Sequence, residues 1–146
     1  MPILTTKLSI NGPVISVLVG VSGPRLAALK LAGKPVPGPF LAPALVDTGA
    51  SCTAIDPEIV QALSLVPTGT IGISTPSTAG VPHQCTKYDA MIGILLDPPN
   101  IHVSITVPVI ETRLASQGIK ALIGRDVLGQ GLLIYNGKAG QVVLSF

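Results

Sequence analysis

The sequence predicts an all-β domain that contains one or two short helices. Fourteen prolines and sixteen glycines interrupt the 146 residues too often for long helices to form. Val, Ile and Thr are concentrated in short runs between these breaks, as is typical of β-strands. A chain of this length can bury roughly two thirds of its unfolded surface in one core. We therefore expect a single domain over residues 1–146.

The N-terminal part of the chain predicts a hairpin followed by an irregular segment. Residues 3–10 and 14–19 are two strand-like runs, and Asn11-Gly12 between them predicts a tight hairpin turn. Residues 22–39 contain four prolines. This stretch predicts an irregular surface excursion with one or two helical turns.

The next segment predicts a strand and then a helix. Residues 41–46 form an apolar run that ends at Asp47. A helix is predicted to begin after Asp56, whose side chain can cap the first turn. Pro57 suits the first helical position, and Glu58 faces the positive end of the helix dipole.

The remainder of the chain predicts hairpins and one short helical turn. Residues 68–84 favour a mobile hairpin because small and hydroxyl side chains predominate there. Further strands are predicted at residues 88–95, 101–110 and 121–123, and at the flanks of a C-terminal hairpin, residues 132–135 and 141–146. Pro98-Pro99-Asn100 is expected to form the turn before the strand at residues 101–110. A loop is expected over residues 111–120, and a brief helical turn is expected after Gly124.

Composition limits the classes of function. Hydrophobic residues make up 47% and charged residues 11%, which favours an oligomer that hides apolar surface, although no apolar run reaches the length of a membrane span. The net charge of +2 comes from scattered residues without a basic cluster, so we expect no nucleic-acid partner. No signal-peptide pattern follows Met1, which favours a cytoplasmic location. Cys52 and Cys85 are expected to be reduced thiols, and we expect no metal or cofactor.

Asp47-Thr48-Gly49 is the candidate site. A carboxylate at the end of a buried strand is costly unless it is paired, hydrogen-bonded or used for proton chemistry. The same three residue types also favour an ordinary turn. The tripeptide alone therefore leaves both interpretations open.

Two segments in a fixed order carry a resemblance to a known family. Residues 44–51 read Ala-Leu-Val-Asp-Thr-Gly-Ala-Ser, and residues 121–124 read Ala-Leu-Ile-Gly. With this ordered pair, the chain resembles the retropepsin-like aspartic proteases, particularly the bacterial single-domain members. The resemblance implies a closed, barrel-like half of an acid protease. It also implies that Asp47 is catalytic, that the Thr48 hydroxyl locks the active-site loops together, and that Gly49 lets the backbone approach the carboxylates.

The resemblance further implies a homodimer acting on polypeptide. Peptide hydrolysis by this route needs two carboxylates that share a proton, and the sequence has a single Asp-Thr-Gly. The partner carboxylate would be Asp47 of a second copy. A flap near residues 73–81 would close over the substrate. The implied substrate-binding residues are Ala50, Ser51, Ile73, Ser74, Thr75, Pro76, Ser77, Thr78 and Gly124.

Two other functions remain open at this point. The same fold can serve as a peptide-binding or assembly module without turnover, and a monomeric barrel can use Asp47 only in a turn. Two departures from the viral members also stand out. In the viral members, an acidic residue at the position of Ser51 pairs with an arginine that corresponds to Arg125. The C-terminal hairpin is also longer than the single strand of the viral members.

Overall fold

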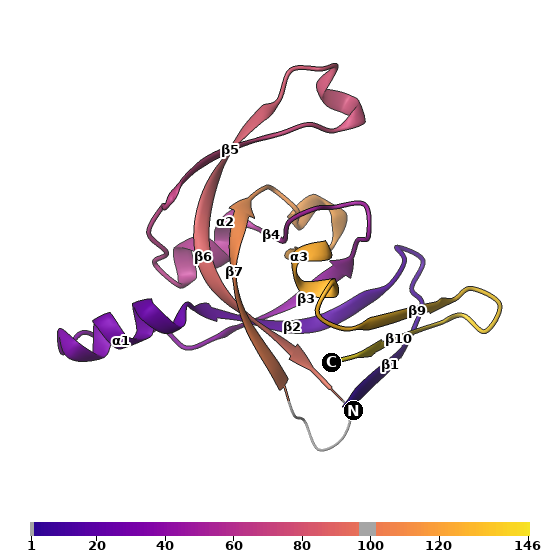
Figure 1. Ribbon diagram of the computed structural model, residues 1–146, viewed down its shortest axis with the longest axis horizontal. Coiled ribbons are helices and arrows are strands. Elements are labelled where there is room, and N and C mark those ends of the chain that lie inside the picture. The colour runs from indigo at the N-terminus through magenta and orange to yellow at the C-terminus, as the bar shows by residue number, and fades with distance from the viewer. Residues whose placement is uncertain (1, 97–101) are drawn as a thin grey trace.

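The computed structural model describes residues 2–96 and 102–146, so the predicted turn at residues 98–100 lies outside the described part. Strands predominate, with three short α-helices and two 3₁₀ turns, η1 and η2 (Figure 1). The elements are β1 (Ile3–Lys7), β2 (Val14–Val21), α1 (Gly23–Leu31), β3 (Phe40–Val46), β4 (Ala54–Ile55), α2 (Pro57–Ala62), β5 (Gly69–Ile73), η1 (Pro76–Thr78), β6 (His83–Leu95), β7 (His102–Glu111), η2 (Ala115–Gln117), β8 (Ala121–Ile123), α3 (Arg125–Leu128), β9 (Leu132–Asn136) and β10 (Gln141–Ser145).

Six strands close into a mixed barrel. Their order is β2-β3-β8-β4-β7-β6, and pairing of β2 with β6 closes the ring, while β5 extends it beyond β6. The β3–β8 and β4–β7 pairs are parallel, and the others are antiparallel. The alternating side chains of the barrel strands, among them Val17, Val19, Ile92, Ile94 and Ile123, are fully buried in one core. The predicted all-β barrel is therefore confirmed.

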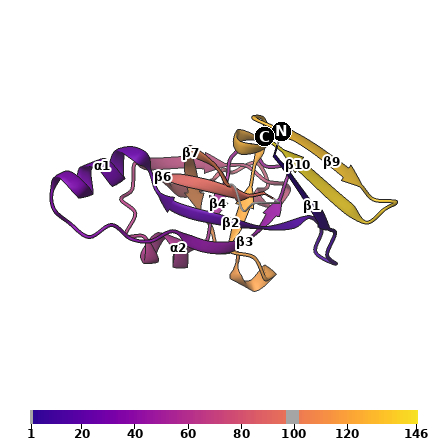
Figure 2. The ribbon, with the colours of Figure 1, turned by 90° about the horizontal axis from the view of Figure 1, so that it is seen from below.

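The predicted N-terminal hairpin is wrong in its pairing. Two backbone hydrogen bonds between Ser9 and Gly12 form the expected turn, but β1 then pairs with β10 instead of β2. β3 pairs with one edge of β2 along Val14–Val19, and β6 pairs with the other edge along Val17–Val21, so only residues 14–16 of that second edge remain open to β1. β1, β10 and β9 instead form a separate three-stranded sheet beside the barrel (Figures 1 and 2).

Helix α1 is more regular than the sequence predicts. It covers nine residues, with Pro24 in its first turn, and the Ser22 hydroxyl accepts a hydrogen bond from Arg25 N–H (3.3 Å). Local capping therefore overrides the proline-rich surroundings. The helix extends away from the barrel (Figures 1 and 2). No helix within the described residues is long and apolar enough to cross a membrane.

Strand β6 begins at His83, five residues earlier than predicted. Alternation of apolar and polar residues is hard to detect there, because Cys85 is the only buried residue between His83 and Lys87. These residues pair with β5. The strands predicted at residues 101–110 and 121–123 and the C-terminal hairpin are confirmed by β7, β8, β9 and β10 within one or two residues. The loop predicted at residues 111–120 contains the short turn η2.

The capped start of α2 is confirmed and has a second role. Asp56 is buried, and its Oδ1 accepts from Glu58 N–H at 3.1 Å, as a helix cap does. Its Oδ2 accepts from the N–H groups of Leu114 and Ala115 at 2.9 and 3.0 Å. One carboxylate thus ties the start of α2 to the segment before β8.

Replacing Asp56 tests this tie. Asp56→Ala should lower the free energy of unfolding by about 3 kcal/mol, because three backbone donors lose a charged acceptor in a buried place. Urea denaturation measures the change. Asp89→Ala, which removes an exposed carboxylate from β6, is the matched control and should change stability little. Equal stability of the two variants would contradict the assigned role.

Candidate functional site

Asp47 lies directly after β3, in a tight turn beside β8. Its N–H donates to the Ile123 carbonyl (3.0 Å), and its Oδ1 accepts from Gly49 N–H (2.8 Å). Ala50 N–H closes the turn on the Asp47 carbonyl (3.3 Å). The side chain remains partly exposed. The turn predicted from these residue types is present, and it holds the carboxylate at the surface with one oxygen fixed.

The loop after Asp47 is joined to the start of α3. Arg125 N–H donates to the Ala50 carbonyl (2.9 Å), and the Arg125 guanidinium donates from Nη1 to the Thr48 carbonyl (2.8 Å). The carbonyl of Thr48 thus takes the place of the acidic partner that Ser51 does not supply. These two hydrogen bonds hold the loop at Thr48 and at Ala50, on either side of Gly49.

Thr53 and Asp126 form a third link, which the sequence did not reveal. The Thr53 side chain is fully buried, and its hydroxyl donates to Asp126 Oδ1 (2.8 Å) and accepts from Gly124 N–H (3.1 Å). Thr53 N–H donates to Asp126 Oδ2 (2.9 Å). Asp126 Oδ1 also accepts from Val127 N–H (2.9 Å) within the first turn of α3. A Thr and an Asp that lie 73 positions apart give no local pattern from which this link could be predicted.

Gly124 is buried behind this loop. A Cβ atom there would come within 2.6 Å of the Cys52 carbonyl carbon and oxygen, and within 3.1 Å of the Ala50 oxygen. The missing side chain therefore leaves room for the loop. Gly49 has a similar constraint on the other side, since a Cβ atom would lie 3.0 Å from Asp47 Oδ1.

The residues predicted as a flap form the end of the β5–β6 hairpin. This hairpin rises away from the barrel, and Ile73 pairs with His83 at the end of the ladder (Figure 1). Residues 76–78 form the 3₁₀ turn η1, in which the Thr78 hydroxyl accepts from Thr75 N–H (3.0 Å) and donates to the Thr75 carbonyl (2.8 Å). The Thr75 and Ser77 hydroxyls lie 2.8 Å apart. Most of residues 73–78 are exposed, and the hydrogen bonds described for their tip are internal to it.

Of the two glycines that flank the tip of this hairpin, Gly72 and Gly80, only one has an unusual backbone. Gly80 adopts a φ of +81°, next to Ala79 at +48°, so the return from η1 depends on left-handed residues. Gly72 lies in β5, where a Cβ atom would approach Pro82 Cβ to 3.0 Å. Gly72 thus permits close packing across the hairpin.

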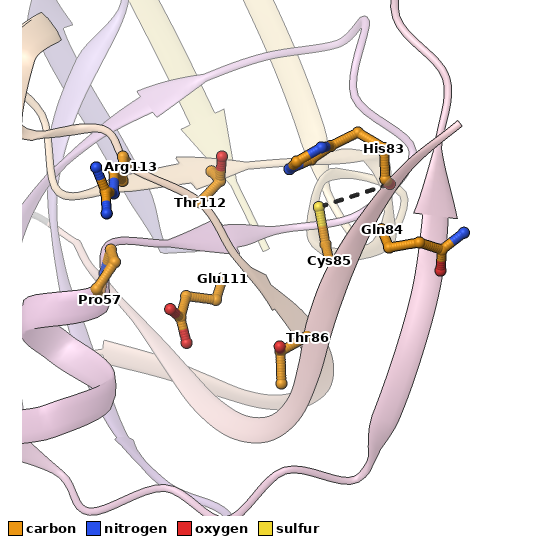
Figure 3. A pocket seen from close by; sticks show the side chains of 8 residues that line it. All are labelled: Pro57, His83, Gln84, Cys85, Thr86, Glu111, Thr112 and Arg113. Carbon is orange, nitrogen blue, oxygen red and sulfur yellow. Dashed lines mark hydrogen bonds between the residues drawn. The ribbon is translucent and has the colours of Figure 1, made fainter. Parts of the chain in front are cut away.

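A hollow of about 430 Å³ lies against strand β6 of this hairpin (Figure 3). Its lining comes from Pro57, residues 83–86 and residues 111–113. Beside it, Tyr88 donates its hydroxyl to Glu111 Oε2 (2.7 Å). Burial, together with this carboxylate, raises the pKa of Tyr88 to about 12. Asp47 is not among the residues that line this hollow.

The two cysteines are free and contribute to one small apolar cluster. Cys85 is buried in it, and Cys52 packs against it. Burial raises the pKa of Cys52, helped by the charge of Asp126, and burial also raises the pKa of Cys85. Among the described residues, no three His, Cys, Asp or Glu side chains gather in a group that could hold a metal ion.

Solved structures show which class of fold this is. A retropepsin-like aspartic protease from Rickettsia conorii matches 97% of this chain and 89% of its own, with a TM-score of 0.56 and 14% identity. EIAV protease with the inhibitor HBY-793 matches 81% and 86%, with a TM-score of 0.48 and 16% identity. The retroviral protease-like domain of Ddi1 from Leishmania major matches 86% and 82%, with a TM-score of 0.42 and 13% identity. No profile of a known family and no curated protein matches the sequence.

The chain therefore has a retropepsin-like fold, which rests on the likeness to the Rickettsia protein. At 14% identity this likeness concerns the fold. The chemistry has to be argued from the residues at the end of β3.

Adding a methyl group at Gly124 should disrupt the loop. Gly124→Ala places a Cβ atom against the Cys52 backbone, and we expect a loss of roughly 2 to 3 kcal/mol in unfolding free energy. Thermal and urea unfolding measure it. Gly38→Ala is the control, because a Cβ atom there meets nothing within 4 Å. An unchanged Gly124→Ala protein would mean that the loop does not need this space.

The Cys52 thiol should be slow to react. Because its pKa is raised, less thiolate is present at a given pH, and thiolate is the nucleophile. In a Cys85→Ser variant, the pH midpoint for alkylation by iodoacetamide should lie above that of the same variant unfolded in guanidinium chloride. A folded midpoint at or below the unfolded one would contradict the assigned environment.

Proposed function

We propose that the protein is a homodimeric aspartic endopeptidase in which Asp47 of each chain supplies one catalytic carboxylate. The observation that carries this proposal is the held but partly exposed Asp47 carboxylate, in a loop fixed to β8 and α3 by five hydrogen bonds or more. A turn residue alone would not need such support. Rigid positioning is what proton-transfer chemistry requires.

The second carboxylate is best supplied by another copy of the chain. The sequence holds one Asp-Thr-Gly. Four other acids have structural partners: Asp56 binds backbone N–H groups, Glu58 pairs with Lys120, Glu111 accepts from Tyr88, and Asp126 binds Thr53. A two-fold axis beside the Asp47 loop would bring two identical carboxylates together.

The reaction then follows from one shared proton. Two adjacent carboxylates cannot both ionise easily, so one stays protonated and the other is charged. The charged carboxylate takes a proton from water while the water oxygen attacks the scissile carbonyl carbon, and the protonated one donates to the carbonyl oxygen. Transfer of a proton to the amide nitrogen then releases the amine as the C–N bond breaks. Water is the only co-reactant.

Other residues of the site receive supporting roles in this proposal. The Thr48 carbonyl is used by Arg125, which leaves its hydroxyl for the partner loop. Ala50 and Ser51 would line the floor beside an extended polypeptide, with Gly124 supporting them from behind. Residues 73–78 would form the flap above it. Their internally capped turn favours closure by movement of the whole hairpin.

Asp47→Asn tests the proposal directly. The variant should lose cleavage of an unfolded polypeptide such as reduced, alkylated casein by at least about a hundredfold, because it removes the proton acceptor. Sedimentation should show the same dimer as the parent protein. Asp89→Asn, which changes an exposed carboxylate on β6, should retain full cleavage. Fragments should be followed from mildly acidic to neutral pH.

Mixing the two proteins tests the shared site. In an equal mixture with free exchange, about a quarter of dimers are parent homodimers, so cleavage per parent chain should fall by about half. Undiminished activity of the mixture, or of Asp47→Asn alone, would contradict the proposal. Binding of casein without fragments by the parent protein would instead favour a peptide-binding module, and a persistent monomer would leave the second carboxylate unsupplied.

A further inference from the structure

The segment between β2 and β3 forms a hollow that lies outside the candidate site. Helix α1 and the proline-rich return at residues 34–39 extend from the barrel and approach the end of α2 (Figures 1 and 2). The hollow has a volume of about 360 Å³. Its apolar lining includes Leu29, Val36 and Leu63. A space of this size and character accepts an apolar side chain.

Positive charge surrounds this apolar floor. Arg25 and Lys34 line the hollow, and Lys30 is exposed on the same helix. From residue 8 to residue 46 these three are the only charged side chains in the sequence. The sequence spaces them over ten positions, but the turn at the end of α1 brings Arg25 and Lys34 to one hollow.

The acids closest in sequence to the hollow's α2 wall are engaged elsewhere. Asp56 caps α2 and binds the N–H groups of Leu114 and Ala115, and Glu58 pairs with Lys120. Neither acid lines the hollow. The positive charge of the hollow is thus not balanced by its own lining residues.

The backbone around the hollow is restricted by turns and prolines of the chain itself. Gly33 has a φ of +64° and ends α1, and Lys34 N–H donates to the Leu29 carbonyl (2.9 Å). Pro35 and Pro37 restrict the backbone of the return. On the opposite wall, Ser64 has a φ of +48° where α2 ends. A preformed hollow loses little conformational entropy when it is filled.

We propose that this hollow is a docking site for an acidic polypeptide segment. An apolar side chain of the segment enters the hollow, and flanking carboxylates meet Arg25 and Lys34. Charge complementarity and the concave shape support this occupant, because a flat anionic lipid surface would meet the cations but leave the apolar floor unfilled.

Docking here does not depend on the proposed catalysis. Strand β3 separates the two places: Phe40 begins it on the side of the hollow, and Val46 ends it next to Asp47. Seven residues of strand span roughly 20 Å. The site can therefore be tested in a protein that cannot cleave.

Peptide binding to the Asp47→Asn protein tests the proposal. The probe is a fluorescent peptide of alternating glutamate and leucine, and its counterpart carries glutamine in place of glutamate. The acidic peptide should bind more tightly, and added salt should weaken it. Arg25→Glu with Lys34→Glu should reduce its affinity about tenfold or more. Lys7→Glu with Lys138→Glu, an equal charge change at exposed positions elsewhere, should not.

Amide shifts in NMR spectra locate the bound peptide. They should cluster at residues 25–37 and 63–64. Shifts centred elsewhere, equal binding of the glutamine peptide, no effect of Arg25→Glu with Lys34→Glu, or binding only to anionic phospholipid vesicles would each overturn the proposal. None of these outcomes bears on casein cleavage, which tests Asp47 separately.

Discussion

The link between the Asp47 loop and the start of α3 is the constraint on which the rest of the structure depends. Parallel pairing of β3 with β8 brings the two segments together, and both then leave the sheet at the same edge. Hydrogen bonds from Arg125, Thr53 and Asp126 join the loops beyond that edge. Gly124 makes the close approach possible. The pairing of β3 with β8 therefore also sets the place of the Asp47 carboxylate.

The acidic residues of this chain divide into two groups. Asp56 accepts hydrogen bonds from backbone N–H groups, and Asp126 accepts hydrogen bonds from Thr53; each joins segments that are distant in the sequence. Asp47 accepts from one N–H through one oxygen and remains partly exposed. Of these three carboxylates, Asp47 accepts the fewest of the hydrogen bonds described. The retropepsin-like fold supplies the position, and the local hydrogen bonds supply the rigidity.

Features set by neighbouring residues could be predicted from the sequence, whereas distant pairings could not. Asp56 and Pro57 marked the start of α2, and the Ile-Gly step at residues 123–124 marked the strand behind the loop. The partner of β1 was missed, because nothing near residues 3–7 shows that β3 and β6 pair with the two edges of β2. Thr53 was missed for the same reason. Its partner lies 73 positions away, and a buried hydroxyl leaves no periodic signal.

That separation has a consequence for how the protein is made. During synthesis the Asp47 loop leaves the ribosome long before Arg125 and Asp126 do, and domains acquire their structure as units once their sequence has emerged. A nascent chain thus carries its carboxylate on an unsupported loop until nearly the whole sequence is available. Contacts of such long range also make folding slow. The hydrogen bonds that join the Asp47 loop to Arg125 and Asp126 therefore form only after most of the chain has emerged.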